Sequence, residues 1–451
     1  VSEILTHNEQ TLQLREENEI GFGEAFVNPS MHAIASADSN QLASNTPIED
    51  KLAVSRCLLT SGFLFGVFDG HGGPECSQVV SKRLFDYIAA SLLPRAELRR
   101  IISEFEEGRM VKLTKVFNDT TEFIPELQRI YDSSFLKWCN HLLNDSASDF
   151  SMDDALTSSF LQLDNDISNE VLENKNSPIY PTLLSVALSG SVACVAHIDG
   201  PHVHIANTGD CGALIGEVAE ESHGGWVVNR LTKDHNWENL TEVKRILSEH
   251  PESERDTIIF NQRLLGTLMP FRAFGDVRFK WDRALQMEIF QSVSAIDMSF
   301  LRNCHTPPYL TAKPEVSYHR LKPHEKFMIL ASDGLWESMN ALDIVNLVGE
   351  YMSGRQTLQP VRLPRRNVSL GEVSRLLKKR QDGLRLKPSD TNASTHLIRH
   401  CIGGTDEGVD HLRLSHSLTL SPDVRRYFRD DISIHVIFFD TNFLRVCPVE
   451  L

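Results

Sequence analysis

The feature that most constrains this 451-residue chain is a set of acidic residues placed where apolar, strand-sized segments end. Phe63–Phe68 runs directly into Asp69, and Phe327–Ala331 is followed within two residues by Asp333. A carboxylate at the end of a buried strand loses its hydration and needs a partner. Several such carboxylates on one rim would repel one another unless cations lay between them. The pattern therefore predicts a fold that gathers strand ends around bound cations.

Further acidic residues lie at comparable places: Asp210 after a predicted strand, Asp430 and Asp431 before the last one, and Glu49 and Asp50 at the end of a polar N-terminal stretch. Each motif alone is weak, because Asp-Gly pairs usually form turns. Together they offer hard oxygen ligands, which favour Mg²⁺ or Mn²⁺ over zinc. Two such ions about 4 Å apart can activate a water molecule near neutral pH. This chemistry suits phosphoryl transfer, where positive charge must offset the phosphate oxygens.

The order of the predicted elements is typical of an α+β fold with antiparallel strand pairing, because strands and helices form separate groups along the chain. Asp199-Gly200 joins two apolar segments in the manner of a hairpin. The stretch up to Leu52 is polar and is predicted to be irregular. The remaining predicted elements are strands at 62–69, 192–198, 202–207, 213–218, 226–231, 316–319, 327–332 and 432–439, and helices at 75–93, 239–249, 341–351 and over most of 95–175.

No Gly/Ser-rich linker divides the chain, which favours one large domain with insertions. We expect an N-terminal extension at 1–44, a catalytic domain at 45–440 with a helical insertion near 95–175 and a basic insertion near 354–390, and a C-terminal tail at 441–451. Ten basic and three acidic residues give the second insertion a charge of +7, whereas the whole chain carries −16. This insertion is either a solvated surface segment or a docking patch for an acidic partner.

Charge and composition also exclude several classes. The net negative charge would repel nucleic-acid phosphates, so we expect no nucleic-acid partner. No apolar run approaches the ~18 residues of a membrane span. The eight cysteines occur singly without a C-x-x-C motif, which indicates free thiols in a reducing compartment. The start of the chain is rich in glutamate, unlike an arginine-rich targeting peptide, so none is expected in this sequence.

The acidic residues belong to an ordered set of motifs that resembles the metal-dependent protein phosphatases of type 2C. The set spans roughly residues 45–440 and consists of Glu49-Asp50, Asp69-Gly70-His71-Gly72-Gly73, Ser189-Gly190-Ser191, Thr208-Gly209-Asp210, Arg272-Ala273-Phe274-Gly275-Asp276, Asp333-Gly334-Leu335-Trp336-Glu337 and Arg429-Asp430-Asp431. The resemblance implies a serine/threonine protein phosphatase built as a four-layer sandwich of two antiparallel β-sheets flanked by α-helices. It also implies two Mg²⁺ or Mn²⁺ ions in a cleft at one end of the sandwich.

The same resemblance implies a role for each residue. It implies that Asp69 bridges the two ions and that Gly70 provides a backbone carbonyl to one of them. It further implies that Asp333 and Asp430 are ligands, and that Glu49 and Asp50 bind through metal-held water. A weaker third ion would be held by Asp210 and Glu337 together with Asp333. His71 would be the general acid that protonates the departing serine oxygen, a task that suits histidine. Asp276 would orient metal-bound water, and Asn45 stands where many members carry an arginine that grips the substrate phosphate.

Four stretches resemble the branch of this family that acts on the pyruvate dehydrogenase complex: Ser39–Leu42, Leu268–Val277, His305–Ala312 and Thr395–His400. The branch implies the phosphorylated alpha subunit of pyruvate dehydrogenase as substrate, with dephosphorylation reactivating the complex. It further implies docking on the lipoyl domain of the acetyltransferase core, to which the basic insertion could contribute, and Ca²⁺ for that docking. A regulatory subunit is another candidate partner, and the mitochondrial matrix is the expected location.

Two other hypotheses stay open. The first is a pseudophosphatase scaffold that binds a partner without turnover, suggested by Asn45, by Val192 in place of the usual threonine and by Cys211 in place of the usual serine. It would need no tightly bound divalent ions, so metal titration separates it from the enzyme. The second is a Ca²⁺-binding module, which would require a D-x-D-x-D-G loop that the sequence lacks. Because none of the predicted metal ligands is missing, the sequence favours the enzyme.

Overall fold

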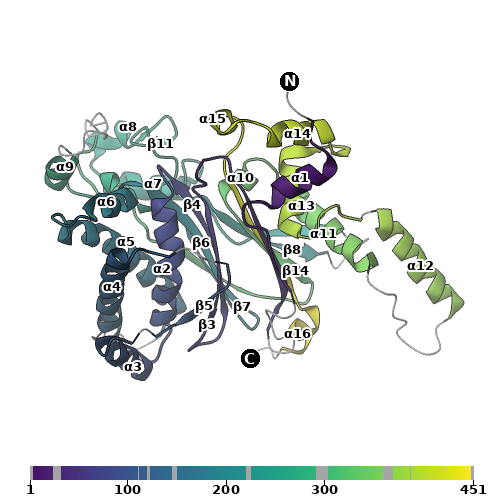
Figure 1. Cartoon of the computed structure of the whole chain (residues 1–451), viewed down its shortest axis with the longest axis horizontal. Helices are drawn as coiled ribbons and strands as arrows, with labels where there is room; N and C mark the ends of the chain where they lie inside the picture. Colours follow the sequence, from purple (N-terminus) through teal and green to yellow (C-terminus); the bar gives the residue numbers. More distant parts are fainter. Residues whose placement is uncertain are drawn as a thin grey trace.

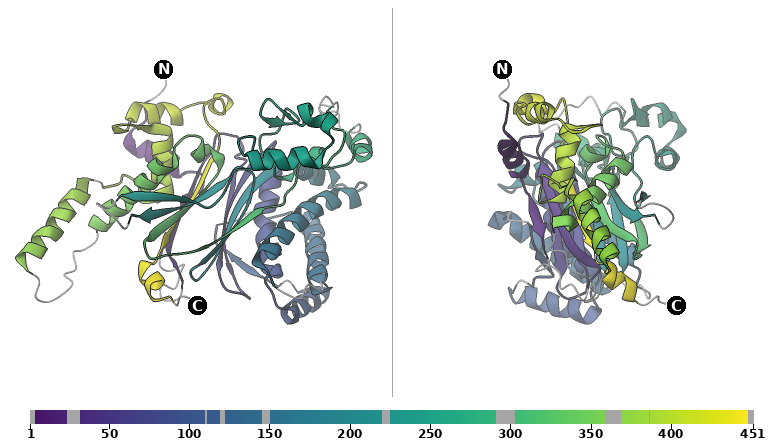
Figure 2. Two further views of the ribbon diagram at one scale, coloured as in Figure 1. Left: turned by 180° about the vertical axis from the view of Figure 1, so that it is seen from behind. Right: turned by 90° about the vertical axis from the view of Figure 1, so that its right-hand side faces the viewer.

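The computed structural model describes residues 4–23, 32–109, 111–118, 122–144, 150–219, 225–290, 303–358, 369–385 and 387–447. Two antiparallel sheets lie face to face, and helices cover the outer face of each (Figures 1 and 2). The first sheet has the order β1 (Ile20–Phe22), β2 (Ile34–Leu42), β17 (Ile432–Phe439), β14 (Glu325–Ala331), β8 (Gly212–Val218) and β9 (Trp226–Arg230). The second has the order β13 (Glu315–Arg320), β7 (His202–Thr208), β6 (Gly190–Asp199), β4 (Phe63–His71), β3 (Lys51–Cys57) and β5 (Thr114–Val116), with β12 (Phe274–Gly275) also on β6. The predicted four-layer α+β sandwich is confirmed.

Strands β4 and β14 show why the sequence builds four layers. In β4, Phe65 and Val67 face the other sheet, whereas Leu64 and Phe68 face the outer helices. In β14, alternate residues likewise enter the core between the sheets and the core under the outer helices. Because side chains alternate along a strand, a strand buried on both faces must be apolar throughout. The continuous apolar runs of both strands follow from this arrangement.

Helices complete the outer layers. On the second sheet lie α2 (Glu75–Ser91), α3 (Arg95–Glu106), α4 (Pro125–Asn144), α5 (Met152–Glu173) and α6 (Tyr180–Leu188), which confirms the helical character predicted for 95–175 (Figure 1). On the first sheet lie α1 (His7–Arg15), α11 (Ala341–Leu358), α13 (Ala393–Gly403) and α14 (His411–Leu418). Val80, Leu84 and Ile88 of α2 are buried as their helical spacing predicts.

The prediction of an irregular stretch up to Leu52 is wrong, because this stretch contains α1, β1 and β2. Strand β2 pairs with β17 along its length, from Leu42 opposite Ile432 to Ile34 opposite Phe439. Its polar residues are buried but hydrogen-bonded: the Nδ2 of Asn40 donates to the Leu14 carbonyl at 2.7 Å, for example. A polar sequence therefore does not exclude a strand inside the sheet when partners satisfy its side chains. The domain boundary at residue 45 stays a prediction, although β2, which precedes it, belongs to the sandwich.

The remaining elements lie at the ends and edges of the sandwich. They are α7 (Leu240–Glu249), η1 (Glu252–Glu254), α8 (Arg255–Ile258), β10 (Ile259–Phe260), β11 (Arg263–Leu264), η2 (Val277–Phe279), α9 (Arg283–Phe290), α10 (Asp333–Trp336), β15 (Gly404–Thr405), β16 (Gly408–Val409), α15 (Pro422–Arg425) and α16 (Thr441–Val446). The helix α12 (Leu370–Arg385) of the predicted basic insertion projects from the body beside α11 (Figure 1). Residues 359–368 of that insertion, with Arg362, Arg365 and Arg366, lie outside the described residues.

Two predictions about composition can also be compared with the structure. All eight cysteines are free thiols, as their isolated positions predict. Among the helices of the described ranges, none combines the length and the apolar character that crossing a membrane requires.

Candidate active site

The predicted acidic residues come from strand ends that the topology places at the same end of the sandwich. In the second sheet, Asp69 at the end of β4 lies opposite Val192 of β6, and the next residue of β6 lies opposite Thr208 at the end of β7. Asp210 follows two residues later. In the first sheet, β14 and β17 are antiparallel. Asp333, which follows β14, and Asp430, which precedes β17, therefore lie at the same end of these two strands. The alternation of strand directions thus gathers acids that are far apart in sequence.

These carboxylates act on one another electrostatically. Burial raises the pKa of Asp69 well above its ordinary value, and the negative charges of Asp333, Asp50, Asp210 and Asp430 raise it further. Burial likewise raises the pKa of Asp333, with Asp210, Asp430 and Glu337 adding to the effect. These interactions place Asp69, Asp333, Asp210, Asp430 and Asp50 in one acidic group, called the acidic cleft below. The structure therefore places these acids within electrostatic range of one another, and their roles as metal ligands stay predictions.

The residues predicted to hold a third ion adjoin the same group. Burial raises the pKa of Asp210 to about 7, and the charges of Asp234, Glu337 and Asp430 act in the same direction. The pKa of Glu337 is raised by burial and by Asp430. Glu337 itself is exposed, whereas Asp210 is half-buried. This part of the group consequently opens toward solvent.

The chemistry of this acidic cleft fits hard divalent cations. No ion pair with a basic side chain is formed within the described ranges by Asp69, Asp333 or Asp210. The Oδ2 atom of Asp50 is buried and has no hydrogen-bond partner among the described residues. A Cβ atom at Gly70 would collide with the Glu49 carbonyl oxygen, so only glycine allows the Gly70 backbone to lie this close to Glu49. Unpaired carboxylate oxygens in a desolvated group are the donor set that Mg²⁺ and Mn²⁺ prefer.

Asp431 organises one wall of the cleft, a role that the sequence analysis did not assign to it. Its buried carboxylate accepts hydrogen bonds from the backbone N–H groups of Ser44 (2.5 Å), Asn45 (2.9 Å) and Glu49 (2.9 Å). The side-chain amide of Asn45 also donates to it at 3.1 Å. The carboxylate of Glu49 in turn accepts from the backbone N–H of Gly73 at 2.8 Å. The loop with three predicted site residues is thus fastened to the residue next to Asp430. Only the Arg-Asp-Asp motif marked Asp431 in the sequence.

His71 and Asp276 form a close pair at the margin of the cleft. The distance from His71 Nε2 to Asp276 Oδ2 is 2.5 Å, and Asp276 is buried while the ring of His71 is a quarter exposed. A Cβ atom on Gly190 would overlap both groups, which explains the glycine there. His71 also acts electrostatically on Glu49, which places the ring near the loop that carries Glu49. A carboxylate that orients an imidazole is a typical arrangement for proton transfer. The family resemblance implied that Asp276 orients metal-bound water, and this contact with His71 was not predicted.

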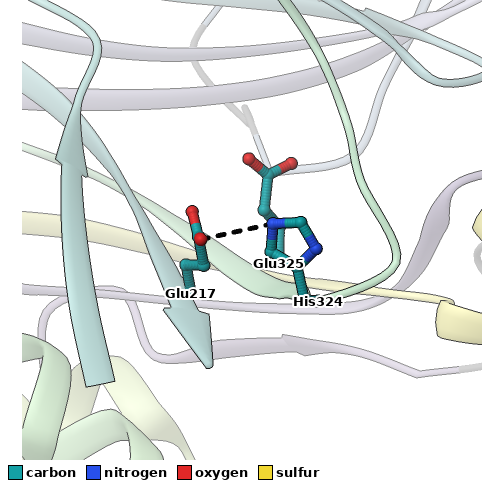
Figure 3. Close-up of side chains that lie close together, drawn as sticks. All are labelled: Glu217, His324 and Glu325. Carbon is teal, nitrogen blue, oxygen red and sulfur yellow. Dashed lines mark ion pairs between the residues drawn. The ribbon is translucent and has the colours of Figure 1, made fainter. Parts of the chain in front are cut away.

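A second group of acidic and histidine side chains lies at the opposite ends of β8 and β14. It comprises Glu217, His324 and Glu325, whose potential ligand atoms lie within 4.8 Å of one another (Figure 3). Here the carboxylates already have partners: Glu217 pairs with His324 at 3.2 Å, and Glu325 accepts from His319 at 2.7 Å and from the Lys322 backbone at 2.7 Å. We therefore interpret this group, called the paired cluster below, as structural.

Comparisons with known proteins agree with the geometry of the cleft. A family model described as Protein phosphatase 2C matches residues 118–377. The mitochondrial pyruvate dehydrogenase (acetyl-transferring) phosphatase 1 of Homo sapiens is 43% identical, over 98% of this chain and 83% of that protein. Phosphatase 2 of the same name and organism is 41% identical, over 90% of this chain and 78% of that one. The Saccharomyces cerevisiae phosphatase 1 is 30% identical, over 89% and 68%. The chain therefore belongs to the protein phosphatase 2C family of metal-dependent serine/threonine protein phosphatases.

Proposed function

We propose that this protein uses two Mg²⁺ or Mn²⁺ ions to hydrolyse phosphoserine on the alpha subunit of pyruvate dehydrogenase, and that this reactivates the complex. The observation that carries the proposal is the unpaired acidic cleft, in a chain 43% identical to a pyruvate dehydrogenase phosphatase over 98% of its length. Relatives named as mitochondrial support a location in mitochondria, and we assign the matrix because the complex is the substrate.

The proposed metal ligands are the carboxylates of Asp69, Asp333 and Asp430 and the backbone carbonyl of Gly70, with Glu49 and Asp50 acting through water. Asp69 would be the central ligand of this set, because its carboxylate interacts with acids from both sheets. Asp210 and Glu337 would add a third, more exposed position beside Asp333. When bound, the ions would neutralise the phosphate oxygens and lower the pKa of a coordinated water.

The chain's own residues would manage the proton and the substrate. Attack of water on phosphorus breaks the bond between phosphorus and the serine oxygen, and His71 would give a proton to that oxygen as it leaves. Asp276 would hold the His71 ring in the orientation that this transfer needs. Asn45 remains a candidate contact for the phosphate, because its amide has a second N–H besides the one that donates to Asp431.

The proposed docking partner is the lipoyl domain of the acetyltransferase core, with Ca²⁺ supporting the contact and a regulatory subunit as a further partner. The basic helix α12 is one candidate contact, because it projects from the body (Figure 2) and carries exposed Arg375 and Lys378. Deletion of residues 359–385 should then weaken docking.

The decisive experiment is a phosphatase assay on phosphorylated pyruvate dehydrogenase, with and without lipoyl domain and Ca²⁺. We expect phosphate release that needs Mg²⁺ or Mn²⁺, stops with EDTA and accelerates with the lipoyl domain. Activity on a generic phosphoserine peptide but not on pyruvate dehydrogenase would contradict the proposed substrate, while the proposed phosphatase reaction would still hold. Metal binding without turnover on any phosphoprotein would favour the scaffold.

A further inference from the structure

The loop after α15 presents an arginine and two aromatic side chains to solvent beside the acidic cleft. Tyr427 is 86% exposed and Phe428 is 68% exposed. The preceding Arg425 anchors the loop, because its guanidinium donates to the carbonyl of Leu420 at 3.3 Å. Arg426 is exposed, and its side chain makes no ion pair or hydrogen bond with the described part of the chain. Large apolar rings exposed next to an uncommitted cation are typical of a binding surface.

A pocket of about 530 Å³ lies between this loop and the loop that carries Asn45. Its walls are formed by Ser44, Asn45, Thr46, Pro422, Asp423, Arg426 and Tyr427. The two loops are held together by Asp431 and by the Ser44 hydroxyl, which donates to the Asp430 carbonyl at 2.9 Å. One end of each loop therefore belongs to the acidic cleft, and the outer part of each forms the pocket.

Arg426 is within electrostatic reach of the cleft. Burial raises the pKa of Glu49, and the positive charge of Arg426 opposes that rise. Two other arginines near the cleft are already engaged: Arg272 donates to both carboxylate oxygens of Glu242 at 2.8 Å, and Arg278 lies 3.7 Å from Asp276. Arg426 is consequently a cation at this rim that an incoming anion meets without displacing an internal partner.

We propose that this pocket is a substrate subsite in which Arg426 binds an oxyanion of the phosphoprotein and Tyr427 packs against the adjoining residues. The proposal rests on the proposed phosphatase function of the cleft. A fixed cation at the entrance of the cleft attracts an acidic phosphopeptide and orients it. The oxyanion is either the phosphate of the phosphoserine or a carboxylate that flanks it. A guanidinium binds both through the same paired N–H groups.

The test compares Arg426→Ala, Arg426→Lys and the control Arg445→Ala, which removes an exposed arginine from α16, at the other end of the sandwich (Figure 1). Each variant is assayed with p-nitrophenyl phosphate and with phosphoserine peptides that have acidic or neutral flanks. We expect Arg426→Ala to raise KM about tenfold for the acid-flanked peptide, with kcat changed much less. Arg426→Lys should recover part of the loss, and Arg445→Ala should behave as the wild type.

The substrates separate the two sources of the oxyanion. A larger loss in kcat/KM on the acid-flanked peptide than on p-nitrophenyl phosphate identifies the flanking carboxylate, whereas an equal loss on all three substrates identifies the phosphate. An Arg426→Ala enzyme with wild-type KM on every substrate overturns the proposal. Fluorescence anisotropy with a labelled phosphopeptide provides a second readout that needs no turnover. If the wild-type protein is inactive but binds the peptide through Arg426, only the proposed catalysis fails.

Discussion

Acidic side chains lie at both ends of the sandwich, but the two groups differ in whether their carboxylates have partners within the chain. At one end, burial and neighbouring carboxylates raise the pKa values of Asp69, Asp333 and Asp210, and none of the three has a basic partner within the described ranges. At the other end, Glu217 lies 3.2 Å from His324 (Figure 3), and Glu325 lies 2.7 Å from His319. The residue types are similar, so composition alone does not distinguish the two groups.

The difference lies in what compensates the charge. A buried carboxylate paired with a histidine is satisfied within the chain and stabilises the fold. Carboxylates that face only one another are destabilising until a cation arrives from outside, which is typical of functional sites. The acidic cleft should therefore respond to metals and control activity, and the paired cluster should control stability alone.

The largest expected effect is a loss of phosphatase activity that follows substitution in the acidic cleft but not in the paired cluster. Asp69→Asn keeps the shape of the side chain but removes the charge at the centre of the cleft, so kcat/KM on a phosphoserine peptide should fall on the order of 10³-fold. The matched variant Glu217→Gln in the paired cluster should stay within about twofold of the wild type. Full turnover by Asp69→Asn at saturating Mn²⁺ would remove the functional distinction between the two ends.

A smaller effect concerns proton transfer at the margin of the cleft. His71→Asn should lower kcat on a phosphoserine peptide about 10²-fold, because the serine oxygen is a poor leaving group without a proton. The loss should be much smaller with p-nitrophenyl phosphate, whose leaving group is stable as an anion. Asp276→Asn should cost about tenfold, since it disturbs the orientation of His71. Equal losses on both substrates would contradict a general-acid role for His71.

In the paired cluster the expected effect is on folding. Glu325→Ala leaves His319 and the backbone N–H of Lys322 without their acceptor, so the free energy of unfolding in urea should fall by about 2 kcal/mol. Activity per folded molecule at 25 °C should match the wild type. A variant that keeps its stability but loses activity would place function at this end as well.

The smallest effect is the pH dependence of the metal-free protein. The pKa of Asp210 is raised from an ordinary 3.8 to about 7, so the folded state binds a proton more tightly than the unfolded state. The stabilisation from that proton is complete at low pH and is lost as pH rises through 7. In EDTA, stability should fall by about 1 kcal/mol between pH 6.5 and 8.5.

Two comparisons check the origin of this slope. Asp210→Asn should flatten it, and saturating Mn²⁺ should restore stability at pH 8.5, whereas Glu217→Gln should leave the slope as it is. Buried His435, whose pKa burial lowers to about 4, destabilises the fold only below about pH 6.5, so it does not act in this window. A slope that survives in Asp210→Asn would assign the titration to other groups.

Much of the fold could be predicted because the strands buried on both faces are apolar throughout, as β4 and β14 are. Strand β2 could not, since Asp38, Ser39, Asn40 and Gln41 are buried only by virtue of hydrogen bonds from distant segments. Local polarity indicates exposure, and only the tertiary partners reverse that expectation. The role of Asp431 could not be predicted for the same reason, because its partners lie almost 400 residues earlier in the chain.

The order of residues along the chain was enough to predict that acids stand at strand ends, that the apolar strands are covered on both sides, and which family the motifs resemble. These properties are local, because they depend on the order of polar and apolar residues. The tertiary structure decided which acids face one another, that His71 contacts Asp276, and that Arg426 borders a pocket with Asn45. Those contacts join residues hundreds of positions apart, and only the pairing and stacking of the two sheets determines such distances.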